Sequence, residues 1–418
     1  MLSYLKENFF TLILWLKKPS NGLWLTPVLG AVFAVFLALF AALIKNKSLP
    51  LDIIPDISAE LLNDILSIMA SSMLAVSTFS LSIMVSAFSS ASNGATPRAT
   101  ELVMGDNTTR LAIASFISAF VYAVIAKITL GMEYYNEAGR FVLFIGTICV
   151  LIYLITTLIT WVSTLSQLGL LNNTLDKIET ASQQALVNYW ESPNMGAKSL
   201  EKIHFSYAIY AYKTGYLSHI NMQNLQDFAE KNDCQLEIAI QPGKLIYTGM
   251  PLAYANKSID EIAQLQESFI IENNRSYAQD PKFGLLVLSE VAQRALSKAV
   301  NDPGTAIKVI SVLLRLLLDS KVEKQAVKYD RLAMLNLNEQ EFVLQPFTPI
   351  CRDGSSMLEI HIKVQKTLAI LYEMSDSPAI SEAAIKQAKI DLDYALQGLV
   401  LESEKLLIKS THQTLFHK

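Results

Sequence analysis

The chain has 418 residues and a formal net charge of −4, and 51% of its residues are hydrophobic while 17% are charged. This balance has no basic excess, which argues against nucleic acid as a partner. Charged residues are sparse over the first 170 positions and frequent afterwards, so the sequence predicts two parts of different character.

Four apolar stretches in the first part are long enough to cross a membrane. A helix rises about 1.5 Å per residue, so roughly 20 residues span a hydrocarbon core of about 30 Å. The stretches at 23–44, 65–92 and 141–165 carry no charge, and the stretch at 111–132 carries only Lys127. We therefore expect residues 1–171 to form a transmembrane domain of about four helices.

The positions of basic residues predict the orientation of these spans. Lys17 and Lys18 follow the apolar N-terminal residues without a small-residue cleavage site, so we expect no removed signal peptide. The basic residues divide between the two sides of the membrane, with Lys6, Lys17, Lys18, Arg98, Arg110 and Lys177 on one side and Lys45, Lys47 and Arg140 on the other. The positive-inside rule then predicts that both termini are cytoplasmic.

The second stretch carries a stripe of small hydroxyl side chains. Steps of three, four or seven place these residues on one helix face: Ser67, Ser71, Thr78, Ser82, Ser86 and Ser89. Small hydroxyl residues line water paths, and they also allow neighbouring helices to pack closely. The stripe therefore predicts either a pore-lining face or a helix-packing face, and the sequence leaves both open.

Three residues beside the spans are candidates for gating or lipid contact. Pro97 removes a backbone donor and restricts the residue before it, so we expect the second helix to end near Asn93. Arg98 would then lie at the membrane surface and pair with lipid phosphate or with an acidic residue of the cytoplasmic domain. We expect Lys127 to snorkel to the outer interface, or to act there as a fixed cation at a pore mouth.

Charges return from residue 172, and the pattern predicts an α+β cytoplasmic domain over 172–418. Alternating apolar residues and a Gln241–Pro242–Gly243 turn predict a small β-module at 206–255. Helical spacing covers 257–320 and 355–411, with one long helix expected at 381–407. Residues 341–350 are expected to add a strand to the small sheet.

The stretch 272–305 has the richest chemistry of this domain. Aspartates precede prolines at 280–281 and 302–303, an order typical of a helix N-cap followed by proline at the first helical position. Two arginines bracket the first of these helices, and a helix N-terminus with arginines favours an anion. The same residues suit a salt-bridge cluster between subunits or a solvated face. The candidates for an anion-binding or assembly site are Arg275, Asp280, Arg294, Asn301, Asp302 and Thr305.

Motifs for catalysis or metal binding do not emerge from the sequence. The five histidines are scattered without metal-ligand spacing, and we find neither a glycine-rich phosphate loop nor a Ser-His-Asp or Cys-His pattern. We therefore expect no enzyme activity, no metal site and no cofactor.

Several short motifs, taken together and in order, resemble one family. They are the Ser89–Arg98 segment, Gly215-Tyr216-Leu217, Gly249-Met250-Pro251-Leu252 and Asn301-Asp302-Pro303. The combination resembles bacterial predicted integral membrane proteins catalogued as domain of unknown function 2254 (DUF2254). This chain has Thr96 where the family usually has serine, and Lys298 where it usually has proline. The resemblance implies a multi-pass protein of the bacterial inner membrane with a cytoplasmic domain, and it implies no activity.

These features lead to one functional hypothesis and an alternative. We expect a homo-oligomeric channel or passive transport protein, in which the second span lines the path and the cytoplasmic domain gates it. Its partners would be the lipid bilayer and a small anion or ion. The alternative is a membrane-anchored sensor or scaffold without transport activity.

Overall fold

The computed structural model describes residues 28–33, 35–36, 40, 57–94, 96–99, 107–132, 135–165, 170–259, 262–320 and 322–416. The chain divides into two compact units. The first unit contains Met1–Gly94 and Thr100–Asn173, and the second contains Ala95–Ala99 and Thr174–Lys418. The short segment Ala95–Ala99, which follows the second predicted span, therefore belongs with the C-terminal part of the chain.

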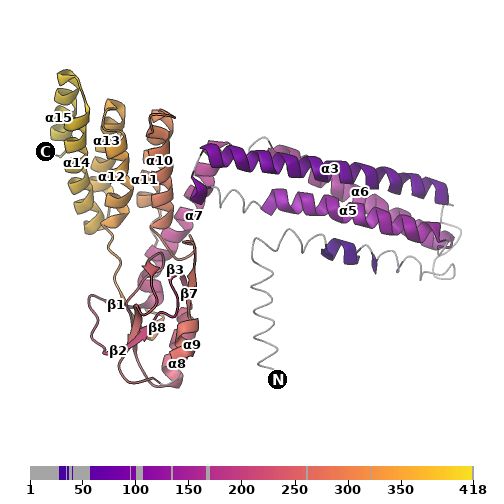
Figure 1. Cartoon of the computed structure of the whole chain (residues 1–418), viewed down its shortest axis with the longest axis horizontal. Helices are drawn as coiled ribbons and strands as arrows, with labels where there is room; N and C mark the ends of the chain where they lie inside the picture. Colours follow the sequence, from indigo (N-terminus) through magenta and orange to yellow (C-terminus); the bar gives the residue numbers. More distant parts are fainter. Residues whose placement is uncertain are drawn as a thin grey trace. The chain divides into compact units, whose positions relative to one another are not determined.

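Three helices of the first unit are long and apolar enough to span a membrane, among the residues that the structure describes. They are α3 (Ala59–Gly94), α5 (Asn107–Gly131) and α6 (Glu137–Leu165), which lie side by side in Figure 1. Phe116 and Trp161 pack edge to face at 5.9 Å between ring centres within the apolar core of this unit. The expected first span, 23–44, falls largely outside the described residues. The part of it that is described includes residues 28–33, which are helical.

The second unit contains two small sheets. The helix α7 (Leu171–Glu191) and a 3-10 turn, η3 (Pro193–Gly196), precede them. The larger sheet has the order β1-β8-β4-β6-β2, with antiparallel pairs among β4, β6 and β2 and parallel pairs of β8 with β1 and β4. Its strands are β1 (Ala197–Leu200), β2 (Tyr207–Tyr210), β4 (Leu236–Ile238), β6 (Pro251–Ala255) and β8 (Tyr329–Leu335).

The smaller sheet is antiparallel, with β3 (Gly215–Ile220) between β5 (Leu245–Ile246) and β7 (Phe269–Glu272). Two short helices accompany the strands, α8 (Met222–Lys231) and α9 (Ile262–Glu267). Asn221 caps α8, since its side chain accepts a hydrogen bond from the backbone of Asn224. Leu217, Leu236 and Phe269 are buried in the core that both sheets share.

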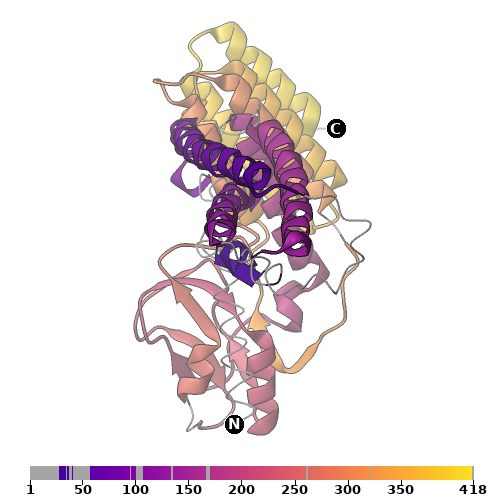
Figure 2. The same ribbon diagram turned by 90° about the vertical axis from the view of Figure 1, so that its right-hand side faces the viewer.

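Six longer helices form the rest of the second unit. Figure 2 shows them gathered at one end of this unit and the strands at the other. The helices are α10 (Phe283–Leu296), α11 (Pro303–Asp319), α12 (Glu341–Asp353), α13 (Leu358–Met374), α14 (Pro378–Gly398) and α15 (Glu402–Phe416).

Several expectations for this unit are wrong. Residues 341–350 lie in the helix α12 rather than in a strand, because Phe342, Val343, Phe347 and Ile350 all fall on its buried side. Two prolines inside α12 hide that helical pattern, since proline usually interrupts a helix. The long helix expected at 381–407 is broken into α14 and α15. Strand β7 lies inside the range expected to be helical, and β8 was not predicted.

A buried polar network joins the last three helices. His361 Nδ1 lies 2.7 Å from Asp391 Oδ1, and Gln365 donates to Asp391 Oδ2 at 2.9 Å. The Gln365 oxygen lies 2.9 Å from His412 Nδ1 on α15. Asp391, His361 and Gln365 are fully buried, so a missing partner would leave a polar group unsatisfied.

We predict that Asp391→Ala loosens this part of the unit. Each buried polar group left without its partner costs about 1–3 kcal/mol, and Asp391 bonds both His361 and Gln365, so the opening free energy of α13 and α14 should fall by that order. Amide hydrogen exchange measures this free energy. Asp393→Ala is the matched control, because Asp393 is exposed on the same helix and its removal should cost under about 0.5 kcal/mol. Equal protection of both variants would contradict the structural role of the network.

Candidate functional site

The segment that follows α3 is held against α10 by Arg98. Its Nη1 forms an ion pair with Glu290 Oε1, and its guanidinium carbon lies 6.0 Å from the centre of the Phe283 ring. Ala99 beside it is fully buried. The helix α3 ends at Gly94, one residue beyond the predicted end, and Pro97 is exposed in the short helical stretch 97–99. The structure thus places an acidic residue of the C-terminal unit beside Arg98.

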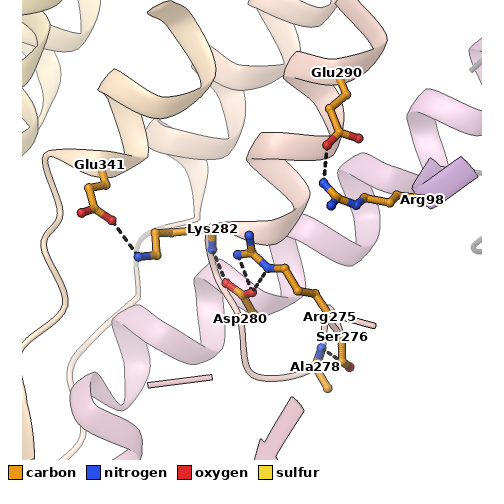
Figure 3. Close-up of polar contacts among 8 residues, drawn as sticks. All are labelled: Arg98, Arg275, Ser276, Ala278, Asp280, Lys282, Glu290 and Glu341. Carbon is orange, nitrogen blue, oxygen red and sulfur yellow. Dashed lines mark hydrogen bonds and ion pairs between the residues drawn. The ribbon is translucent and has the colours of Figure 1, made fainter. Parts of the chain in front are cut away.

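A second cluster surrounds the buried carboxylate of Asp280 (Figure 3). Arg275 approaches it with Nε at 2.8 Å and Nη2 at 2.6 Å, both from Asp280 Oδ2. The backbone amide of Lys282 donates to Oδ1 at 3.2 Å. The Lys282 ammonium lies 2.7 Å from Glu341 Oε2 at the start of α12, so the cluster reaches from the loop before α10 to α12.

Burial raises the pKa of Asp280, although Arg275 and Lys282 both favour its ionised form. Because the folded state then holds the proton more tightly than the unfolded chain, protonation of Asp280 favours folding. That contribution is fully present below the unfolded pKa and is lost as pH rises through the folded pKa.

The expected N-cap role of Asp280 is wrong, and that of Asp302 is confirmed. The helix α10 begins at Phe283 with Lys282 as its N-cap residue, and the Asp280 carboxylate accepts from the Lys282 amide while it also binds Arg275. Asp302 accepts from the Thr305 backbone amide at 3.1 Å and from its hydroxyl at 2.6 Å, and these hydrogen bonds lower the pKa of Asp302. The N-terminus of α11 therefore already carries its own carboxylate.

The six residues proposed for an anion or assembly site do not form one group around the α11 N-terminus. Arg275 precedes α10, whereas Arg294 lies in its last turn, and eleven residues of helix between 283 and 294 correspond to about 16 Å. Asn301 lies in the loop before α11 with a positive φ of 50°. Asp302 pairs with Thr305 at the start of α11.

The turn at Gly243 and the side chain of Gln279 connect the smaller sheet to this cluster through hydrogen bonds to β3. Gly243 has φ +89°, and a Cβ at this position would lie 1.9 Å from Asp280 Oδ2. Its amide donates to the Leu217 carbonyl at 2.8 Å. Gln279 accepts from the Ile220 amide at 2.8 Å and donates to the Ile220 carbonyl at 3.2 Å. The sequence identified the Pro–Gly turn, but nothing local in it predicts the approach of Asp280 or the contacts of Gln279.

A cleft of about 360 Å³ opens beside the Asp280 cluster. The turn Gln241–Lys244, Arg275, Lys282, Glu341 and the 336–338 loop line it. A second cleft of about 350 Å³ shares Gln241, Pro242 and Leu337 with the first. Both clefts belong to the second unit.

The hydroxyl stripe of α3 does not form the packing face of that helix. Ser71, Thr78, Ser82, Ser86 and Ser89 are exposed and Ser67 is half-buried, whereas the buried serines are Ser77 and Ser80, which the stripe omits. The hydroxyls of Ser67, Ser71 and Thr78 bond to the preceding turn, as in Thr78 Oγ1 to the Ala75 carbonyl at 2.9 Å. Apolar residues such as Leu74 are also exposed, so exposure alone does not separate a water-facing side from a lipid-facing one.

Lys127 on α5 meets the first residue of the stripe. Its ammonium donates to Ser67 Oγ at 2.8 Å, and the Lys127 side chain is exposed. A lysine on α5 and a serine on α3 are thus in contact within the first unit.

In the part of the chain that the structure describes, no three His, Cys, Asp or Glu side chains gather in a group that could hold a metal ion. A family model described as a predicted membrane protein, DUF2254, matches residues 20–370. No curated protein and no solved structure matches the chain. The matched range includes α3, α5 and α6, the contact of Arg98 with Glu290, and the cluster around Asp280.

We predict that Gly243→Ala destabilises the second unit more than Gly249→Ala. Both glycines have positive φ, so both substitutions cost about 1–3 kcal/mol of backbone strain. Only Gly243 has a carboxylate where the new methyl group must lie, while nothing approaches Gly249 within 4 Å. The melting temperatures of the two purified variants compare these costs. Equal melting temperatures would show that the Asp280 contact does not constrain the turn.

Proposed function

Because the chain belongs to the DUF2254 family of predicted membrane proteins, we propose that it is an integral membrane channel or passive transport protein. In this proposal α3 lines the path and the C-terminal unit, on the cytoplasmic side of the bacterial inner membrane, gates it. The protein works as a homo-oligomer on an ion or small solute and does no chemistry on it.

The contact between Arg98 and α10 carries the proposal. Arg98 follows the last residue of α3 by four positions, a distance of at most about 13–14 Å when extended. A movement of α10 therefore reaches the end of α3 through a short connection. An ion pair exposed at the surface contributes about 0–1 kcal/mol, which suits a contact that is made and broken during gating.

Features of the first unit support the assignment of α3 to the path. The stripe faces away from the buried side of α3, where Ser77 and Ser80 lie. Its hydroxyls remain able to accept hydrogen bonds from water while donating to the helix backbone. The Lys127 ammonium beside Ser67 adds a cation near one end of the stripe.

We predict that single cysteines at Ser71, Thr78 and Ser82 react with a charged, membrane-impermeant thiol reagent, because these positions face water. Cysteines at Leu74 and Leu81 are the controls and should not react, because they face lipid. The native Cys149 is exposed, so the experiment uses a Cys149→Ala background. Equal labelling of both sets, or labelling of neither, would refute a wet face on α3.

We predict that Arg98→Glu and Glu290→Arg each change solute flux into proteoliposomes several-fold, because each places like charges together. The double variant restores the pair and should return flux toward the parent value. Arg315→Glu is the control, since it breaks a pair with Glu179 at 2.8 Å within the second unit that shares no residue with the Arg98 contacts. If the parent protein shows no flux, the sensor or scaffold alternative is favoured. If the single variants show the same flux as the parent protein, gating through Arg98 is refuted.

A further inference from the structure

We infer that the cleft beside Asp280 binds a water-soluble, compact polyanion such as a di- or triphosphate group, and that its occupancy acts on the Arg98 contact. The binding site stands independently, whereas its effect on Arg98 rests on the proposed gating function.

The cleft has more cations than anions. Lys244, Arg275 and Lys282 line it together with one acid, Glu341. The Lys282 ammonium is paired with Glu341, and Arg275 uses Nε and Nη2 on Asp280. The Lys244 ammonium has no ion-pair partner among the described residues, and the Nη1 group of Arg275 is not used on Asp280. The charge that the cleft leaves uncompensated is therefore positive, which favours an anionic ligand.

The 336–338 loop, which also lines the cleft, supplies amide donors. Asn336 Oδ1 accepts from Asn194 at 3.0 Å and from Ser199 at 2.7 Å. Asn338 Oδ1 accepts from the Gln340 amide at 3.2 Å. Because both side-chain oxygens are engaged within the protein, the groups that Asn336 and Asn338 retain for a ligand are their NH₂ donors. Donors on both walls match a ligand with several acceptor oxygens.

The size of the cleft fits a small molecule. A volume of about 360 Å³ falls at the lower end of the range for small-molecule sites. A compact ligand with clustered negative charge uses the donors of both walls at once, whereas a single carboxylate would meet only part of them.

A shared aromatic ring connects the cleft to Arg98. The Arg275 guanidinium carbon lies 5.0 Å from the centre of the Phe283 ring, and that of Arg98 lies 6.0 Å from the same centre. Arginine is attracted to the face of an aromatic ring. An anion that binds the Arg275 Nη1 group while Nε and Nη2 stay on Asp280 therefore acts on a guanidinium that shares the Phe283 ring with Arg98, at the start of the helix that carries Glu290.

Calorimetric titration of the detergent-solubilised full chain with inorganic phosphate, pyrophosphate and ATP tests the site. We expect saturable binding of pyrophosphate that Lys244→Ala weakens at least tenfold. This variant should fold, since the Lys244 ammonium leaves behind no ion-pair partner in the part of the chain that the structure describes. Lys213→Ala is the matched control, because Lys213 lies over the Tyr212 ring outside the cleft and carries the same charge. No saturable binding of any of the three anions, or equal weakening by both variants, would overturn the site.

Two further arms define the ligand and its effect. Pyrophosphate affinity should be the same in phosphatidylcholine nanodiscs with and without phosphatidylglycerol, and loss of affinity with the anionic lipid would overturn a soluble ligand in favour of a lipid headgroup. Pyrophosphate should change flux in the parent and not in Lys244→Ala. Binding without a change in an otherwise measurable flux would overturn the regulatory half alone, while absence of all flux would refute the proposed function and leave the binding site standing.

Discussion

One buried carboxylate, that of Asp280, constrains how the second unit is put together. A buried charge is costly unless it is paired, so Asp280 requires the Arg275 guanidinium and the Lys282 amide in fixed positions. It also requires a glycine at 243, because a side chain there would occupy the same space. With Gln279 bonded to β3, the loop before α10 is held between the smaller sheet and the helices. Asp280 thereby fixes where α10 begins.

The position of α10 in turn decides what the connection after α3 can contact. Phe283 and Glu290 are seven residues apart, two turns of helix, so they lie on the same face of α10. Arg98 contacts both of them, the ring through its guanidinium and the carboxylate through an ion pair. The helix α3, a candidate membrane span, is therefore followed within a few residues by a segment that contacts α10, which begins three residues after the buried Asp280. Within the second unit, Arg98 and the cleft residue Arg275 contact the same Phe283 ring at the start of α10.

The sequence predicted what depends on local pattern and missed what depends on tertiary contact. Long apolar stretches with at most one charge were enough to place three candidate spans to within about six residues at their ends, and the Asp302 cap followed from a local Asp–Pro order. Helix α12 was missed because its prolines conceal a helical spacing that only burial reveals. The partner of Arg98 lies 192 positions away, so the sequence offered an acidic residue as one of two partners without identifying Glu290. Likewise, Arg275 and Arg294 were expected to converge, but the length of helix α10 lies between them.

Arg98 holds the segment that follows α3 against α10. Electron cryomicroscopy of the full chain in lipid nanodiscs, at a resolution that shows side chains, tests this contact most directly. The account predicts density that joins the Arg98 guanidinium to Glu290 and places it over the Phe283 ring, with the α3 stripe facing a water-filled space between subunits. Density that places Arg98 on lipid phosphate, with Glu290 in solvent and the stripe against acyl chains, would contradict the account.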